Sequence, residues 1–254
     1  MTGREAEIAS TMPADLDSLP RLNGFRLRGL EMTRLETFID AAFAFAITML
    51  VISPGEVPRD FDALVSAFRN VPAFIVSIAT LGLFWRGHWI WSRRYGLEDT
   101  TSILVSWAML AMILIYVYPL KLLFGGMFYH LSHRVGQPIG IRTAVEARAF
   151  FAIYASGVAL ISLAVLFLNL HAWRLRDALR LNERERWITR GELSGWSLPI
   201  GVGLISLVLA LTLPVKWIDW SGWVFCSLII LAPIQRRWRK RQLTRVANEI
   251  GRRP

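Results

Sequence analysis

The amino-acid sequence predicts an all-α polytopic membrane protein with six transmembrane helices. Of its 254 residues, 54% are hydrophobic, and the mean hydropathy is +0.41. The apolar residues are gathered in six blocks, and most blocks are near the ~20 residues that a helix needs to cross a ~30 Å hydrocarbon core. A soluble chain of this length would have only about one or two fully buried helices of this kind.

Each block ends where the local sequence opposes a helix or an apolar environment. Ser53-Pro54-Gly55 follows the first block, a glycine-rich loop over 126–148 follows the third, and Pro214-Val215-Lys216 separates the last two. The charged segment 171–192, between the fourth and fifth blocks, is predicted to form an amphipathic helix on the cytoplasmic surface of the membrane. The predicted spans are residues 36–53, 70–91, 102–123, 149–170, 197–215 and 217–234.

The distribution of basic residues predicts the orientation. Most of the 29 Lys and Arg residues lie in the two end segments and in the second and fourth loops. The positive-inside rule therefore places both termini in the cytoplasm of a bacterium, with the spans in its inner (plasma) membrane. The first 20 residues are polar, so the first span is expected to act as an uncleaved anchor. The predicted domains are a flexible cytoplasmic tail (1–30), a six-helix transmembrane domain (31–235) and a basic cytoplasmic tail (236–254).

The formal net charge of +10 is better explained by lipid than by nucleic acid. The basic runs over 174–190 and 236–245 adjoin span ends, where cationic side chains meet anionic head groups. We therefore expect the lipid bilayer as a partner and no nucleic acid. The single cysteine, Cys226, lies inside the last predicted span and is interpreted as a small core residue.

Sequence signatures of catalysis and metal binding do not point to an enzyme. The chain contains no P-loop, no His-Glu-x-x-His and no Gly-x-Ser-x-Gly motif. His130 and His133 have a spacing that could bind a metal, but no third ligand lies near them in the sequence. We therefore expect no catalytic residues, no cofactor and no metal site.

A carboxylate in the first apolar helix marks the candidate functional region. Asp40 follows Arg34 by about two turns, and a carboxylate at such a place must be paired or face a polar interior. Trp85 and His88 in the second span have a spacing that puts both on one helix face, where they could donate hydrogen bonds to Asp40. One interpretation is a polar contact that fixes the packing of the first two spans. The other is a proton relay through Asp40 and His88.

A second face of the same helix is apolar apart from one threonine. Ala41, Phe45, Thr48 and Ile52 share this face, and Asp40 lies about 140° away from Phe45 around the helix. The pattern suits a pore-lining helix with a hydrophobic constriction, because narrow apolar pores can exclude water. Ordinary helix packing is the alternative interpretation.

Three ordered motifs resemble the bacterial transmembrane protein 175 family, potassium channels of endolysosomes and prokaryotes. The first is Arg34-x-x-x-Phe38-Ile39-Asp40, which is similar to the family's Arg…Phe-Ser-Asp signature, with Ile39 in place of the serine. The second is Trp85-x-x-His88, and the third is Tyr118-Pro119-Leu120 at the end of the third span. The resemblance covers residues 34–122.

This resemblance implies a transmembrane protein 175-like fold and a homotetramer in which the first helix of each subunit lines a central pore. The constriction would lie at Phe45, where family members carry Ile or Leu, and Thr48 would lie one turn further along. An interhelical polar network near the cytoplasmic end would contain Arg34, Phe38, Asp40, Trp85 and His88.

We therefore expect a potassium-permeable ion channel subunit with K⁺ as the permeant ion. A proton- or solute-coupled transporter using Asp40 and His88 is one alternative. A non-conducting membrane scaffold is another. A transporter of this size would be expected to show broken helices or internal repeats, and the sequence shows neither.

Overall fold

Long helices form most of the chain. A computed structural model describes residues 15–51, 60–131 and 140–250, apart from a few side chains within these ranges. These ranges contain one antiparallel hairpin, whose two strands have two residues each, and long α-helices joined by loops and short helical turns. The elements are β1 (Arg21–Leu22), β2 (Phe25–Arg26), α2 (Arg34–Val51), α3 (Phe61–Arg69), α4 (Val71–Tyr95), α5 (Thr100–Leu131), α6 (Ala144–Arg174), α7 (Glu183–Thr212), η1 (Val215–Trp217), α8 (Trp220–Trp223), η2 (Val224–Cys226) and α9 (Ser227–Ile250).

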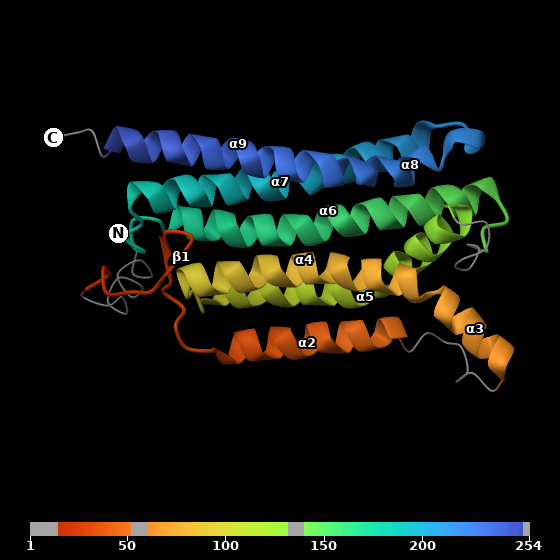
Figure 1. The fold of residues 1–254 in the computed structure, drawn as a ribbon, viewed down its shortest axis with the longest axis horizontal. Helices are drawn as coiled ribbons and strands as arrows, with labels where there is room; N and C mark the ends of the chain where they lie inside the picture. The colour runs from red at the N-terminus through yellow and green to blue at the C-terminus, as the bar shows by residue number, and fades with distance from the viewer. Residues whose placement is uncertain (1–14, 52–59, 132–139, 251–254) are drawn as a thin grey trace.

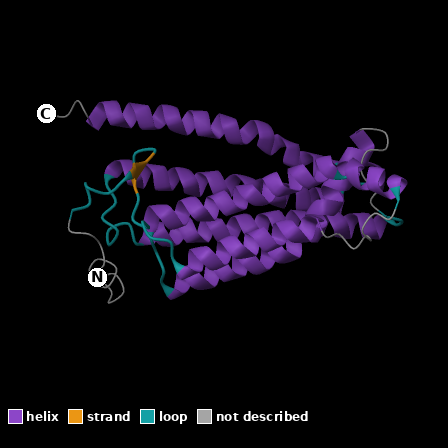
Figure 2. Ribbon diagram, turned by 60° about the horizontal axis from the view of Figure 1, so that its bottom comes forward, coloured by secondary structure: helices purple, strands orange, loops and turns teal. Residues whose placement is uncertain are grey.

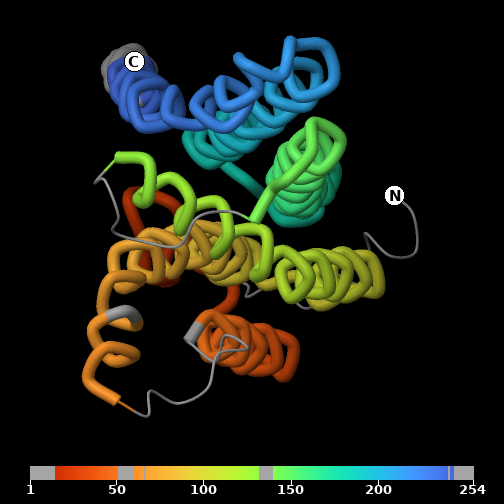
Figure 3. The backbone as a smooth tube through the Cα atoms, turned by 90° about the vertical axis from the view of Figure 1, so that its right-hand side faces the viewer, coloured from red at the N-terminus to blue at the C-terminus, as the bar shows by residue number. Residues whose placement is uncertain are grey.

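The long helices run roughly parallel to one axis, in the order α2, α4 with α5, α6, α7 and α9 across the molecule (Figure 1). Viewed along the helices, α2 and α9 lie on opposite sides of the bundle (Figure 3). The hairpin and the C-terminal end of α9 lie at one end, whereas α3 and α8 lie at the other (Figure 1). We call these the hairpin end and the α8 end.

The all-α class is confirmed, and the chain is a membrane protein. Within the described residues, five helical segments are long and apolar enough to cross a membrane: Val71–Tyr95, Thr100–Leu131, Ala144–Arg174, Glu183–Thr212 and Val215–Arg239. They contain the second to sixth predicted spans, except for residue 70 just before α4 and residues 213–215 just after α7. The first predicted span corresponds to α2, which has 18 residues and includes three charged ones, Arg34, Glu36 and Asp40.

The main apolar core lies between α2, α4, α5 and α6. Leu81, Ile113 and Ile161 are fully buried in it, one from each of the last three helices. A second apolar cluster lies nearer the hairpin end, around Trp91 and Tyr95 of α4. Phe25 of the hairpin belongs to this second cluster and is fully buried. Burial of this aromatic ring stabilises the attachment of the hairpin to the helices.

A buried ion-pair cluster also attaches the hairpin to α7. Both Arg26 and Arg28 contact Glu185, with nitrogen-to-oxygen distances of 2.9 and 3.0 Å, and Glu185 is fully buried. The backbone N–H of Arg26 donates to the same carboxylate at 2.9 Å. The hydrogen bond to Glu185 raises the pKa of Arg26. Glu185 also completes the N-terminal cap of α7 by accepting from the backbone N–H of Asn182 at 3.0 Å.

These contacts correct the prediction of a flexible tail over residues 1–30. Residues 21–28 form a hairpin and a buried clasp, because Phe25 and the two arginines find partners in α4 and α7 that are remote in the sequence. Residues 1–14 lie outside the described part of the chain. The predicted basic tail over 236–254 also lacks a structural boundary, since α9 continues from Ser227 to Ile250.

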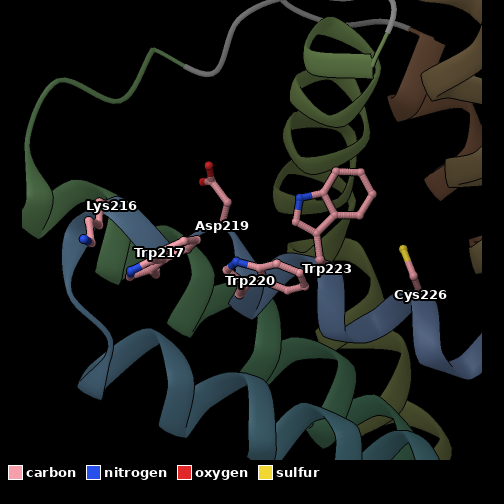
Figure 4. Close-up of a pocket in the computed structure, with 6 residues that line it drawn as sticks. All are labelled: Lys216, Trp217, Asp219, Trp220, Trp223 and Cys226. Atoms are coloured by element: carbon pink, nitrogen blue, oxygen red, sulfur yellow. The ribbon is translucent and has the colours of Figure 1, made fainter.

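The sixth predicted span begins irregularly, at the α8 end. Pro214 is followed by the short turns η1, α8 and η2 before regular helix resumes in α9. A cavity of about 550 Å³ lies here, with Lys216 and Trp217 at one side and Cys226 at the other (Figure 4). Trp217 and Trp220 are at least half exposed. Exposed tryptophans at a span end are typical of the membrane–water interface.

Candidate functional site

Helix α2 has one buried and one exposed face. Its buried face packs against α4 and α5 and consists of Ile39, Phe43, Ala46 and Leu50, none more than 2% exposed. The predicted apolar face points away from these helices. Ala41, Phe45 and Thr48 are exposed, and the Phe45 side chain is 57% exposed. Ile52, the fourth residue predicted on this face, lies outside the described residues.

The exposed face of α2 presents aromatic rings between small side chains. Phe38 is 52% exposed and lies about two turns before Phe45. The Thr48 hydroxyl donates to the carbonyl oxygen of Ala44 at 2.9 Å, so its hydrogen bond stays within its own helix.

At the C-terminal end of α2, the Lys121 ammonium donates to the Leu50 carbonyl oxygen at 2.8 Å. A cation at the C-terminal end of a helix stabilises its unpaired carbonyls.

Asp40 and Trp85 are in direct contact, as their sequence positions suggested. The indole nitrogen of Trp85 donates to a carboxylate oxygen of Asp40 at 2.7 Å. The bond joins α2 to α4. The Trp85 ring is also stacked on that of Trp89, with 6.3 Å between centroids. Asp40 is half-buried rather than sealed in the core.

His88 and Phe38, two other residues of the predicted network, have partners on α5. The His88 ring nitrogen lies 3.0 Å from the Ser106 hydroxyl, and His88 is only 2% exposed. The Phe38 ring lies 6.0 Å from that of Trp107. The five predicted residues therefore do not form one cluster within the subunit: Asp40 binds Trp85, whereas His88 and Phe38 bind neighbouring residues of α5.

The predicted pair between Arg34 and Asp40 is wrong within the subunit, since among the described residues no ion pair joins them. Arg34 is exposed at the first turn of α2. Six residues correspond to a rotation of about 120° and a rise of about 9 Å, so the two side chains leave the helix on different faces. Two turns of sequence separation are not sufficient for contact.

Sequence reasoning missed the ion pair that does join α2 and α4. Arg93 lies 3.1 Å from Glu36, and Glu36 is only 2% exposed. Arg93 also donates to the carbonyl oxygens of Gly29 and Leu30, at 3.1 and 3.0 Å. It thereby connects the segment before α2 to the end of α4. Glu36 in the first turn of an apolar helix was the available signal.

Replacing Trp85 by phenylalanine tests the contact with Asp40. The variant keeps an aromatic ring but loses the N–H donor to a charged acceptor, and such hydrogen bonds contribute about 1.5–3 kcal/mol. Because Asp40 is half-buried, we expect a loss near the lower bound. Thermal unfolding of the purified protein in detergent measures it. Trp89→Phe is the matched control, and equal melting temperatures for the two variants would contradict the role of the bond.

Comparisons with known proteins agree on one family. Residues 34–119 match the model of the endosomal/lysosomal potassium channel TMEM175. A protein named potassium channel from Marivirga tractuosa is 32% identical over 197 residues, which cover 75% of this chain and 79% of that protein. The crystal structure of a variant of the potassium channel MtTMEM175, in complex with a nanobody–MBP fusion protein, is similar with a TM-score of 0.75. It is 26% identical, and the match covers 88% of this chain and all of that one.

Proposed function

This chain belongs to the TMEM175 family of potassium channels, and we propose that α2 helices from several copies of it surround the potassium pathway. The observation that carries the proposal is the exposed face of α2. Ala41, Phe45 and Thr48 have no covering helix within the described residues, although the other face of α2 is fully packed. Each chain offers one such helix, and closed symmetry would supply the others.

We propose that α2 crosses the membrane as a sixth spanning helix. Its 18 residues correspond to about 27 Å, close to the thickness of the hydrocarbon core. The three charged residues all lie in its first two turns. Glu36 and Asp40 are held by Arg93 and Trp85, which lowers the cost of placing carboxylates at the membrane boundary.

The proposed orientation places the hairpin end in the cytoplasm. The hairpin and the end of α9 share this end of the molecule, which fits an even number of crossings (Figure 1). The basic residues of α9 also lie towards this end. The Marivirga relative is bacterial, and we propose the bacterial inner membrane as the location.

The narrowest part of the pathway is proposed at Phe45. Its side chain is larger than those of Ala41 and Thr48 on the same face, and it is 57% exposed. Rings of Phe45 around a closed axis would form an apolar constriction, which excludes water and opposes ion passage. The number of copies is proposed to be four, as the family resemblance implies.

Cross-linking of cysteines at position 48 tests whether α2 helices face one another. In a Cys226→Ala background, Thr48→Cys is expected to give disulfide-linked dimers and larger species up to a tetramer, because the side chains would line one axis. Ile229→Cys is the control, since this residue is 75% exposed and belongs to α9, the helix on the side of the bundle opposite α2 (Figure 3). Cross-linking at Ile229 without cross-linking at Thr48 would contradict the arrangement.

Potassium flux from liposomes tests the function itself. Wild-type protein reconstituted into vesicles loaded with K⁺ should release it, whereas a non-conducting scaffold would not. No described contact favours the transporter alternative, because Asp40 and His88 form hydrogen bonds with different partners and are not joined in a relay. Intact oligomers that release no K⁺ under any ionic gradient would overturn the channel assignment.

A further inference from the structure

A cavity at the hairpin end is lined by an excess of positive charge. It has a volume of about 390 Å³ and lies between the first turns of α7 and the basic part of α9. Of the described residues that line it, four are arginines and only one is acidic. These charged residues are Arg94, Arg190, Arg236, Arg239 and Glu192.

The single carboxylate is already engaged. A carboxylate oxygen of Glu192 lies 3.0 Å from a guanidinium nitrogen of Arg94. The Arg94 side chain is only 7% exposed. The Nε of Arg94 is also buried, and it has no hydrogen-bond partner within the described part of the chain. An unpaired buried donor on a guanidinium costs free energy unless a ligand satisfies it. A buried arginine with an unused donor thus lines a cavity whose one described carboxylate is already paired.

Two of the other arginines make contacts with groups that carry no negative charge. Arg239 donates to the carbonyl oxygen of Gly191, and Arg190 lies over the ring of Trp173 at 4.8 Å. Neither contact supplies an anion. Arg239 approaches α7 so closely because Gly191 and Gly195 lack side chains: a Cβ at these positions would lie 3.1 and 3.3 Å from it. The absence of side chains at the two glycines thus leaves the space that the Arg239 guanidinium occupies.

The surroundings of the cavity match the membrane surface. Trp187 and Trp238 line it, and they are 38% and 60% exposed. Tryptophans of this kind lie at the depth of lipid head groups. Helix α9 is the outermost helix, on the side opposite α2 (Figure 3), and its C-terminal part diverges from the bundle (Figure 2). In the proposed arrangement, the cavity therefore lies on the lipid-facing side of the subunit, away from the pore.

We propose that this cavity binds the phosphate group of an anionic phospholipid from the cytoplasmic leaflet. Guanidinium groups bind phosphate oxygens through paired charge-assisted hydrogen bonds, and Arg94, Arg236 and Arg239 approach from two helices, α4 and α9. Basic pockets beside spanning helices are suited to anionic head groups. The lipid assignment rests on the proposed orientation of the chain, whereas the phosphate assignment rests on the cavity alone.

Binding of phosphatidylglycerol to the purified protein tests the proposal. The lipid is added to the delipidated wild-type protein in detergent. Native mass spectrometry counts the bound lipid molecules, and thermal unfolding gives the melting temperature of the same samples. Phosphatidylethanolamine and soluble glycerol phosphate serve as the other two ligands. We expect retention of phosphatidylglycerol and a higher melting temperature with it than with either comparison ligand.

The variant Arg236→Gln should weaken phosphatidylglycerol binding about tenfold or more, because it removes an exposed arginine of the cavity. Arg236 has no described partner to lose, so the variant should fold. Arg237→Gln removes the same charge from the next residue, which is exposed but does not line the cavity, and should bind as the wild type does.

Three results would overturn the proposal in separable ways. Equal weakening by Arg236→Gln and Arg237→Gln would indicate diffuse attraction rather than a site. Equal stabilisation by glycerol phosphate and by phosphatidylglycerol would overturn the lipid assignment. Absence of binding by every phosphate ligand would remove the site altogether. None of these results depends on potassium flux, so they are independent of the channel assignment.

Discussion

Replacing Phe45 by alanine is expected to raise potassium flux about tenfold and to weaken discrimination between K⁺ and Na⁺. The ring is 57% exposed on the face of α2 proposed to line the pore. Removing it would widen the constriction and admit water, so a permeating ion would keep more of its hydration. A tenfold change corresponds to a barrier lower by about 1.4 kcal/mol. Flux of each ion from reconstituted vesicles measures the effect.

The matched control for this prediction is Ile47→Ala. Ile47 lies about 160° around the helix from Phe45 and packs against the apolar core. Its truncation should lower stability while leaving flux through intact oligomers close to the wild-type value. If Phe45→Ala folds normally and conducts at the wild-type rate, the constriction lies elsewhere.

Replacing Glu185 by alanine is expected to lower the stability of the protein more than any other substitution proposed here. The variant leaves Arg26 and Arg28 buried without their carboxylate, and it removes the side chain that caps the first turn of α7. Removing one member of a buried ion pair typically costs about 3–5 kcal/mol. A lower melting temperature in detergent, with release of the hairpin to proteolysis after Arg21 or Arg26, would show it.

Glu183→Ala provides the control for Glu185→Ala. Both residues lie in the first turn of α7 and carry the same charge, but Glu183 is exposed. Both variants therefore remove a similar favourable interaction with the helix dipole, but only Glu185→Ala removes the buried ion pairs with the hairpin. A melting temperature for Glu185→Ala equal to that of Glu183→Ala would contradict the stabilising role of the buried pairs.

The long apolar helices could be predicted from the sequence because they depend on local composition, whereas α3 was not predicted. The separate helix predicted over 171–192 was wrong, since α6 ends at Arg174 and α7 begins at Glu183. Residues spaced by three or four along an apolar helix share a face whatever the rest of the chain does. Ala41, Phe45 and Thr48 were assigned to one face on this basis, and the structure places them on the exposed side. The contact between Asp40 and Trp85 followed from the pairing of adjacent spans.

Contacts between charged residues remote in the sequence could not be predicted in the same way. Glu185 and Arg26 are separated by 159 residues, and each lies in a segment that reads as solvated and polar. Their burial depends on a neighbour that local patterns do not specify. Arg34 shows the opposite error: closeness to Asp40 in the sequence suggested a pair, although helix geometry directs the two side chains apart.

Chemical modification of a cysteine at position 48 tests most directly whether α2 lines the potassium pathway. Vesicles carrying Thr48→Cys in the Cys226→Ala background are treated with a membrane-impermeant, positively charged thiol reagent, and modification is verified by mass. A charged group on this face should repel cations from a narrow pore, so potassium flux should fall steeply, whereas the Cys226→Ala parent should be unaffected. Unchanged flux through fully modified protein would show that α2 does not line the pathway.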